Sequence, residues 1–269
     1  MPDIIVPIKQ VPDMERVKFD TEAGRIDRSS APGEINPFDL HALEAAIQIR
    51  ERIGGTVTTI SMGPPQAEST VRDSLARGAD CGILLAGREF AGADTWATSY
   101  TLACAIRKLG KYDIIICGEK TVDGDTGQVG PEIADWLDIP HVAYVSEIRD
   151  ADEKSITVVA EMEDDRIGIE APLPVLLTVT KDLNMPRLPS FQDKMRARKA
   201  EVTKWGAADI ADVADPANLG LKGSPTRLNK VVIPSEEGRK GEVFRGSPAE
   251  SAAKVADVLQ GLGVLGGAK

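Results

Sequence analysis

The sequence feature that most constrains the fold is an alternation of short apolar runs with longer amphipathic segments, over the first two-thirds of the 269 residues. Apolar runs of strand length occur at residues 3–8, 56–62, 82–86, 112–116 and 141–146. Between them, apolar residues recur at helical spacing, as in Leu40, Leu43 and Ile47. Repeated strand–helix units of this kind predict an α/β, Rossmann-like fold, in which helices cover both faces of a parallel sheet.

Boundary residues support the predicted helices and bring several of their starts to one edge of the sheet. Asn36 before Pro37 is typical of a helix start, with asparagine as the cap and proline in the first turn. Asp94 occupies a capping position before a second helix, and Gly130 begins a third. Because these helix starts follow strand ends, we expect them to face one crevice at the carboxyl edge of the sheet.

The alternation changes after residue 146. Residues 155–162 and 166–170 flank an acidic triplet, which predicts an antiparallel hairpin, and residues 175–180 form a further apolar run. A loop with two prolines and apolar residues follows at about 183–193, before a basic run. We therefore expect a nucleotide-binding α/β domain over residues 1–204.

The remaining segment, residues 205–269, is expected to form a separate arm that contacts a partner. Residues 205–234 are rich in glycine, proline, alanine and aspartate, which predicts extended chain. Ser247 and Glu250 form a capping-box pattern at the start of a helix. The helix carries one apolar stripe, which should pack on the main domain or on another subunit: Val255, Val258, Leu259 and Leu262.

The loop after the fourth run, CGEKTVDGDTGQVGP at residues 117–131, is the main candidate site. Its glycines allow close approach of the backbone to a ligand, and free N–H groups at the following helix start attract phosphate. It lacks the Gly-Lys-Ser/Thr of a Walker A loop and the GxGxxG of a Rossmann fingerprint. Asp123 and Asp125 would repel a pyrophosphate, so we expect them to face sugar hydroxyls or solvent. An ordinary Asp-Gly turn remains the alternative interpretation.

Composition excludes several classes of function. The net charge of −10 and an aromatic content of 4% argue against binding nucleic acid. The three cysteines form no CxxC pair, which favours reduced thiols and a cytoplasmic protein, and two histidines are too few for an expected metal site. There is no apolar run of membrane-spanning length and no signal-peptide pattern, so we expect no membrane span.

Six segments carry a resemblance to a known family: VPIKQVPD at 6–13, INPFDLHALEAA at 35–46, MGPPQAE at 62–68, GAD at 78–80, CGEKTVDGDTGQVGP at 117–131 and EAPLPVLLTVT at 170–180. In this order they resemble the β subunits of electron-transfer flavoproteins. In that family the β subunit forms a heterodimer with an α subunit that carries FAD. The β crevice holds AMP in ordinary members and a second FAD in electron-bifurcating members.

Two segments resemble the bifurcating and nitrogen-fixation-associated branch: DGDTGQVGP in the central loop and DTWATS at 94–99. Ordinary members have a more acidic and less glycine-rich loop. By resemblance, the cofactor contacts fall on Pro7, Asn36, Pro37, Phe38, Asp39, Met62, Gly118, Glu119, Lys120, Thr121, Val122, Asp123, Gly124, Asp125, Thr126, Gly127, Gln128 and Val129. For the FAD-binding branch we add Asp94, Thr95 and Thr98, because threonine hydroxyls near a helix start can donate to a ligand.

The resemblance implies hydride transfer from NADH to the FAD of the β crevice. One electron would then pass to a ferredoxin or flavodoxin, and the other through the α-subunit FAD to an acyl-CoA or other dehydrogenase. Because the flavin carries this chemistry, no catalytic side chain is expected. In this family, a loop after the last strand inserts an apolar side chain into the dehydrogenase, and the matching position is Phe191, with Leu188 as the near alternative.

Two other functions remain open. The chain could be an ordinary member of the family, with AMP as a structural ligand. It could also be a non-redox adenine-nucleotide module of the universal-stress type, which shares the predicted sheet pattern. A module of that kind would not need the loop at 183–191, the basic run or the C-terminal helix.

Overall fold

The structure, a computed structural model, describes residues 1–20, 25–27, 31–227 and 241–264. The chain divides into two compact units, Met1–Lys230 and Val231–Lys269. Within the described ranges, no helix combines the length and the apolar character needed to cross a membrane.

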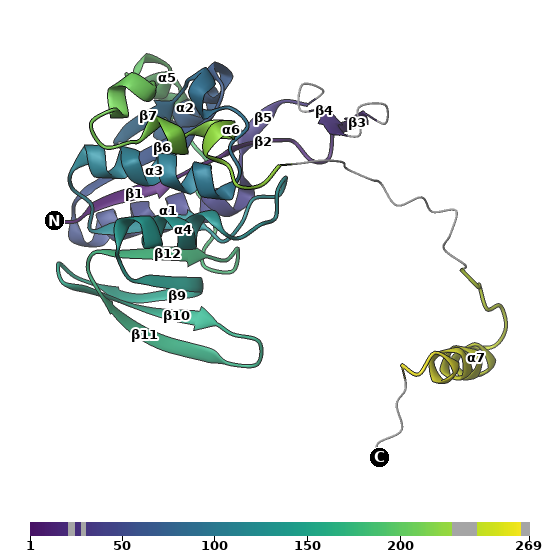
Figure 1. Ribbon diagram of the computed structural model, residues 1–269. Helices are drawn as coiled ribbons and strands as arrows, with labels where there is room; N and C mark the ends of the chain where they lie inside the picture. Colours follow the sequence, from purple (N-terminus) through teal and green to yellow (C-terminus); the bar gives the residue numbers. More distant parts are fainter. Residues whose placement is uncertain (21–24, 28–30, 228–240, 265–269) are drawn as a thin grey trace. The chain divides into compact units, whose positions relative to one another are not determined.

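The first unit is built on one nine-stranded sheet (Figure 1). Its strands are β1 (Asp3–Pro7), β6 (Thr56–Met62), β7 (Cys81–Leu85), β8 (Ile114–Gly118), β9 (His141–Ala151), β10 (Ser155–Glu161), β11 (Arg166–Pro172), β12 (Val175–Val179) and β13 (Thr203–Trp205). Their order across the sheet is β11-β10-β9-β12-β8-β1-β6-β7-β13. All neighbouring strands run parallel except in two pairs, β9–β10 and β10–β11, which are antiparallel. The predicted α/β fold with an antiparallel hairpin is thus confirmed.

The strand order reverses direction between β1 and β8. From β1 the chain adds β6 and β7 on one side, and then crosses back to place β8 and β12 on the other. β1 and β8 are direct neighbours, with Ile4 opposite Ile114. In open α/β sheets, ligands bind outside the carboxyl ends of the strands at such a reversal.

Helices cover both faces of the sheet because the central strands are buried on both sides. α1 (Pro37–Ile53) and α2 (Glu68–Arg77) pack with Ile4, Val6 and Ile116 in one core cluster. α3 (Thr95–Leu109) and α4 (Val129–Leu137) pack with the alternate residues Ile5 and Ile115 in the other. This alternation of neighbouring residues between two cores is what a strand's period of two dictates.

Short antiparallel pairs lie between β1 and α1. β2 (Gln10–Pro12) pairs with β5 (Gly33–Ile35), and β3 (Lys18–Asp20) pairs with β4 (Arg25–Asp27).

Most strand boundaries lie within two residues of the predicted ones, but β9 continues to Ala151, five residues beyond the predicted end at residue 146. β6 has the predicted bounds, whereas β8 begins and ends two residues later than the apolar run 112–116. Asp113 precedes β8, and its amide donates to Asp3 O at 2.8 Å. The later end extends β8 to Gly118, so the first glycine of the central loop belongs to the sheet.

Residues 205–227 belong to the first unit, whereas the sequence suggested an arm beginning at residue 205. They contain the short helices η4 (Ala207–Ile210), η5 (Pro216–Asn218) and α6 (Gly220–Gly223). Ile210 and Leu219 are buried in the core cluster of α3 and α4. The three short helices replace the expected extended chain, and positions 228–234 of that segment lie outside the described residues.

The described part of the second unit contains α7 (Pro248–Gly261). Its predicted capping box is confirmed: Ser247 Oγ accepts from the Glu250 amide, and Glu250 accepts from the Ser247 amide. Val255, Val258 and Leu262 are exposed.

We expect Ile210→Ala to destabilise the first unit, because Ile210 is fully buried. Deleting a buried isoleucine side chain typically lowers the free energy of unfolding by about 2–5 kcal/mol. Leu262→Ala, at an exposed position of α7, should change it by less than about 0.5 kcal/mol. Urea unfolding of both variants measures the difference, and an equally small effect for Ile210 would show that residues 205–227 are not part of the core.

Candidate functional site

The candidate site lies where β1 and β8 end, beside the first turn of α1. Gly118, the last residue of β8, closely approaches that turn: a Cβ at this position would lie 2.5 Å from Asp39 Oδ1 and 2.7 Å from Phe38 Cβ. Only glycine therefore allows the strand and the helix start to come so close. Pro7, at the end of β1, is buried.

Asn36 joins the start of α1 to the central loop. Its side chain is completely buried. Nδ2 donates to Lys120 O at 2.8 Å and to Asp39 Oδ1 at 3.0 Å, and Oδ1 accepts from the Val122 amide at 3.1 Å. Asn36 occupies the predicted cap position, but it makes no capping bond to the helix. Its amide fixes the loop backbone instead.

Asp39 is a buried carboxyl at the base of this network. Its Oδ2 accepts from the Lys9 amide at 2.8 Å. Burial raises the pKa of Asp39 to about 7, although hydrogen bonds from Asn36 and from the backbone of Lys9 and Gly118 act to lower it. Cys117 lies in the same environment, where burial and the Asp39 charge raise the pKa of its thiol. Cys117 therefore stays a protonated, unreactive thiol at neutral pH.

The two aspartates of the loop are each paired with a lysine. Asp123, whose side chain is 1% exposed, lies 2.7 Å from Lys9 Nζ, and Asp125 lies 2.9 Å from Lys120 Nζ. Lys9 Nζ also donates to Thr121 Oγ1 at 3.4 Å. These pairs reduce the repulsion that the aspartates would exert on a bound phosphate.

The two central glycines of the loop have different roles. Gly127 adopts φ +64°, and Asp125 adopts φ 52°, so this part of the loop uses left-handed backbone, which favours glycine. Gly124 does not, and a Cβ there would meet only Thr121 Oγ1, at 3.4 Å. The backbone therefore favours glycine at 127, whereas position 124 has room for a Cβ. The neighbouring Thr126 is exposed.

The far end of the loop meets the start of α3. Thr95 Oγ1 lies 3.2 Å from both Gln128 Oε1 and Glu132 Oε1. The first amides of a helix have no intrahelical partners, and at the start of α4 the preceding Gln128 gives them no side-chain cap. The loop thus spans from α1 to the paired starts of α3 and α4, as the sequence predicted.

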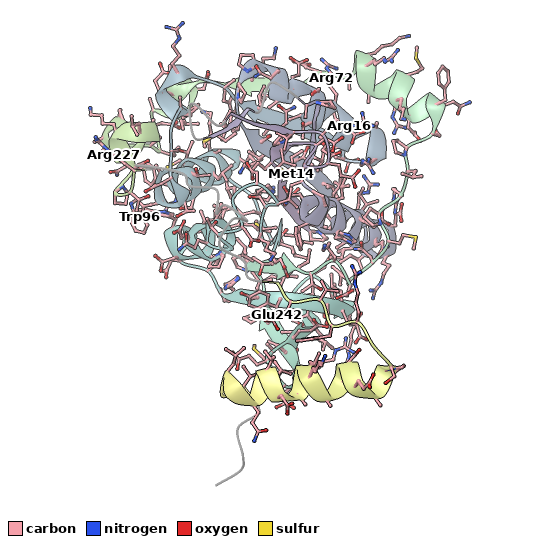
Figure 2. The ribbon with its side chains drawn as sticks, turned by 90° about the vertical axis from the view of Figure 1, so that its right-hand side faces the viewer. Met14, Arg16, Arg72, Trp96, Arg227 and Glu242 are labelled. Atoms are coloured by element: carbon pink, nitrogen blue, oxygen red, sulfur yellow. The ribbon has the colours of Figure 1, made fainter. Side chains whose placement is uncertain are left out.

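Asp94 has a structural role that competes with ligand binding. Its Oδ1 caps α3 by accepting from the Ala97 amide at 3.1 Å. Its Oδ2 accepts from the amide and the hydroxyl of Thr226, at 2.9 and 2.8 Å. Thr98, one turn into the helix, is half-buried. Trp96 is exposed (Figure 2). Its ring packs on that of Trp136, with centroids 4.6 Å apart.

The remaining predicted residues surround the loop. Met62 is half-buried at the end of β6, and Phe38 lies beneath Lys120 and Lys181, whose Nζ atoms are 5.8 and 4.9 Å from its ring centre. Sequence reasoning missed Lys9 and Lys181. Their position in the sequence could have identified them, because each lies within two residues of the end of a parallel strand, β1 or β12.

A cavity of about 400 Å³ borders the start of the loop. It is lined by Glu119, Tyr144, Glu161, Met162, Glu163 and Thr180. Three carboxylates make this side unfavourable for a phosphate, and burial raises the pKa of Glu119. Among the described residues, no group of acidic, histidine or cysteine side chains could hold a metal ion.

Comparison with known proteins gives a consistent result. Residues 23–210 match the family described as "Electron transfer flavoprotein domain". "Electron transfer flavoprotein subunit beta" of Thermoanaerobacterium thermosaccharolyticum is 46% identical, over 98% of this chain and 100% of the relative. "Caffeyl-CoA reductase-Etf complex subunit CarD" of Acetobacterium woodii is 44% identical, over 93% and 94%. "Protein FixA" of Bradyrhizobium diazoefficiens is 42% identical, over 95% and 88%.

We expect the Asp39 carboxyl to make the ligand-free chain less stable as the pH rises from 5.5 to 7. Its folded pKa of about 7 exceeds the unfolded value of about 3.9, so the folded state binds more protons in this window. Asp39→Asn cannot ionise and should remove about 1.5 kcal/mol of this loss of stability. Urea unfolding of wild type and variant at both pH values measures it, and parallel pH profiles would contradict the raised pKa.

Proposed function

Since the chain belongs to the family of electron transfer flavoprotein β subunits, we propose that it forms a heterodimer with an FAD-carrying α subunit and binds a second FAD in its own crevice. When bound there, FAD supplies the chemistry of accepting hydride from NADH and passing its electrons on singly. The proposed acceptors are a ferredoxin or flavodoxin and, through the α subunit, an acyl-CoA or other dehydrogenase. Relatives named FixA and CarD support this branch of the family.

The observation that carries the proposal is that Asn36 fixes one part of the central loop while the next part is exposed. Asn36 fixes the loop through the backbone of Lys120 and Val122. The next part, around Gly124 and Thr126, is exposed, and the Thr126 hydroxyl has no hydrogen-bond partner among the residues that the structure describes. A rigid loop with an open glycine and a free hydroxyl is suited to binding a ligand, whereas a simple turn would need neither.

The protein's contribution is binding and electrostatics. The exposed loop amides and the start of α4 would hold phosphate groups. Lys9 and Lys120, already paired with the loop aspartates, would keep the local charge near neutral. Thr95, beside Gln128, would donate to the part of a dinucleotide that reaches α3. We assign Asp94 mainly to supporting this helix start, because both its oxygens are occupied.

The described helix of the second unit fits contact with the α subunit. α7 exposes Val255, Val258 and Leu262. Exposed apolar stripes of this kind are typical of helices that pack against a partner.

We predict that the wild-type heterodimer carries two FAD and that Gly124→Val selectively loses one. A Cβ at this position meets only Thr121 Oγ1, at 3.4 Å, so we expect the effect of valine to come mainly from blocking the ligand. Thr126→Ala should lower flavin affinity about ten- to a hundredfold, the equivalent of one charge-assisted hydrogen bond. Flavin and AMP released from the denatured complex give the count, and anaerobic NADH titration gives the reducible fraction.

Gly241→Val is the matched control, because a Cβ there meets no atom within 4 Å. One FAD with stoichiometric AMP, and no rapid reduction by NADH, would leave the chain an ordinary member of the family. Unchanged flavin content in both loop variants would favour a simple turn at residues 123–124.

The exposed loop after β12 provides the proposed contact with the dehydrogenase. Phe191 is 78% exposed and Leu188 is 87% exposed. Phe191→Ala should weaken coupling to the dehydrogenase by about 2 kcal/mol, or roughly thirtyfold in affinity, because a buried aromatic anchor typically contributes this much. NADH oxidation by artificial dyes should stay unchanged. If Leu188→Ala has the larger effect, the anchor is Leu188, and loss of both activities would indicate misfolding.

A further inference from the structure

The loop between β12 and α5 (Phe191–Lys199) is fastened to α1 at two points. Asn184 Nδ2 donates to His41 O at 2.9 Å, and His41 Nδ1 lies 3.0 Å from Asn184 O. Three residues later, Arg187 bonds to Glu44 and Glu51. We refer to residues 183–190 as the docking loop.

Arg187 makes an unusually complete set of contacts. Its backbone amide and its Nε donate to Glu44 Oε2 at 3.0 and 2.8 Å, and Nη2 donates to Glu44 Oε1 at 3.0 Å. On the other side, Nη1 and Nη2 donate to the carboxylate of Glu51 at 2.6 and 3.0 Å. The Glu44 side chain is 6% exposed. A bidentate pair with a buried carboxylate fixes both the side chain and the backbone that carries it.

The backbone on either side of Arg187 is also fixed. Arg77 of α2 donates to Arg187 O at 2.9 Å, and Ser190 caps α5 in a capping box with Asp193. Arg72, also of α2, donates to the carbonyls of Ala197 and Ala200 at the end of α5, both at 2.9 Å. The docking loop and α5 are thus held by the side chains of two neighbouring helices.

Three large apolar side chains project from this fixed backbone. Met185 and Leu188 are each 87% exposed, and Phe191 is 78% exposed. They flank Arg187 at intervals of two, one and four residues. Apolar groups on an ordered backbone bind with a smaller loss of conformational entropy than the same groups on a disordered loop.

The charge next to these side chains indicates the chemistry of the partner. α5 exposes Lys194, Arg196, Arg198 and Lys199, on a chain whose net charge is −10. Opposite charges that meet across an interface speed association and exclude wrong partners. An apolar pocket with an acidic rim would complement both the apolar side chains and the basic helix.

We infer that Arg187 is a positioning residue that holds Met185, Leu188 and Phe191 as one preformed docking face, for a partner protein that presents an apolar pocket with an acidic rim. The inference rests on the proposed contact with a dehydrogenase, but it adds the device that makes the loop competent. The partner contacts the three apolar side chains, and Arg187 acts through their backbone.

The first test needs no dehydrogenase. Hydrogen exchange of the docking-loop amides should be at least tenfold faster in Arg187→Ala than in wild type, in the full chain with its α subunit. Glu51→Gln changes an exposed carboxylate and leaves the Arg187–Glu44 pair in place, so it should give a smaller increase in the exchange rate. Arg52→Ala is the matched control. It removes an exposed ion pair between Arg52, which also lies on α1, and Asp150, and it should leave the exchange rates unchanged. Unchanged exchange in Arg187→Ala overturns the inference.

The second test measures docking with a purified acyl-CoA dehydrogenase as the probe. Arg187→Ala should raise the KM for this dehydrogenase at least tenfold, with kcat within twofold of wild type and NADH–dye activity unchanged. Arg187→Lys, which keeps the charge but loses the bidentate geometry, should recover only part of the KM. Faster exchange with an unchanged KM overturns the positioning role. Phosphatidylglycerol vesicles that bind wild type but not Phe191→Ala would instead identify a lipid surface, which overturns the protein partner.

A wild-type complex that reduces dyes but does not couple to the dehydrogenase contradicts the proposed partner. The exchange measurement would then still decide whether Arg187 orders the loop. The two failures are therefore distinguishable.

Discussion

The buried amide of Asn36 is the interaction on which the candidate site depends. It links three polar groups: the Lys120 carbonyl and the Val122 amide, which are partly buried, and the buried Asp39 carboxyl. An amide can donate and accept at once, so one side chain pairs with both a carbonyl and an N–H group of the loop backbone. An apolar residue of the same size would leave buried polar groups unpaired, at about 1–3 kcal/mol each. The loop conformation, and with it the open part at Gly124, follows from this one side chain.

Electrostatic balance makes the proposed phosphate site compatible with an acidic chain. The loop aspartates that argued against a phosphate site on sequence grounds are each paired with a lysine. Lys9 comes from the end of β1, more than a hundred residues before Asp123, so no local pattern revealed the pair. The acidic cavity at the start of the loop includes Glu119, whose carboxylate also interacts with Lys120. Each negative charge of the loop thus has a lysine in its electrostatic surroundings.

The sequence predicted what depends on local chemistry and missed what depends on distant contacts. The strands were found because each central strand is buried on both faces, as the alternation of Ile4 and Ile5 between two cores shows. Capping residues such as Asp94 and Ser247 located the helix starts. Asn36 was placed correctly as a cap, but its side chain binds the loop, 84 residues away. Residues 205–227 pack through a few isolated apolar side chains, such as Ile210, which show no periodicity.

One helix, α1, connects the central loop to the docking loop. The first turn of α1 carries Asp39, and the buried Asn36 precedes it, so its start fixes the central loop. Further along, His41, Glu44 and Glu51 hold the docking loop, and their spacing of three and seven residues places them on a single face. The adjacent stripe of the same helix, with Leu43 and Ile47, packs into the core against β1 and β8. A well-packed helix is a rigid element, so α1 ties the geometry of the central loop to that of the docking loop.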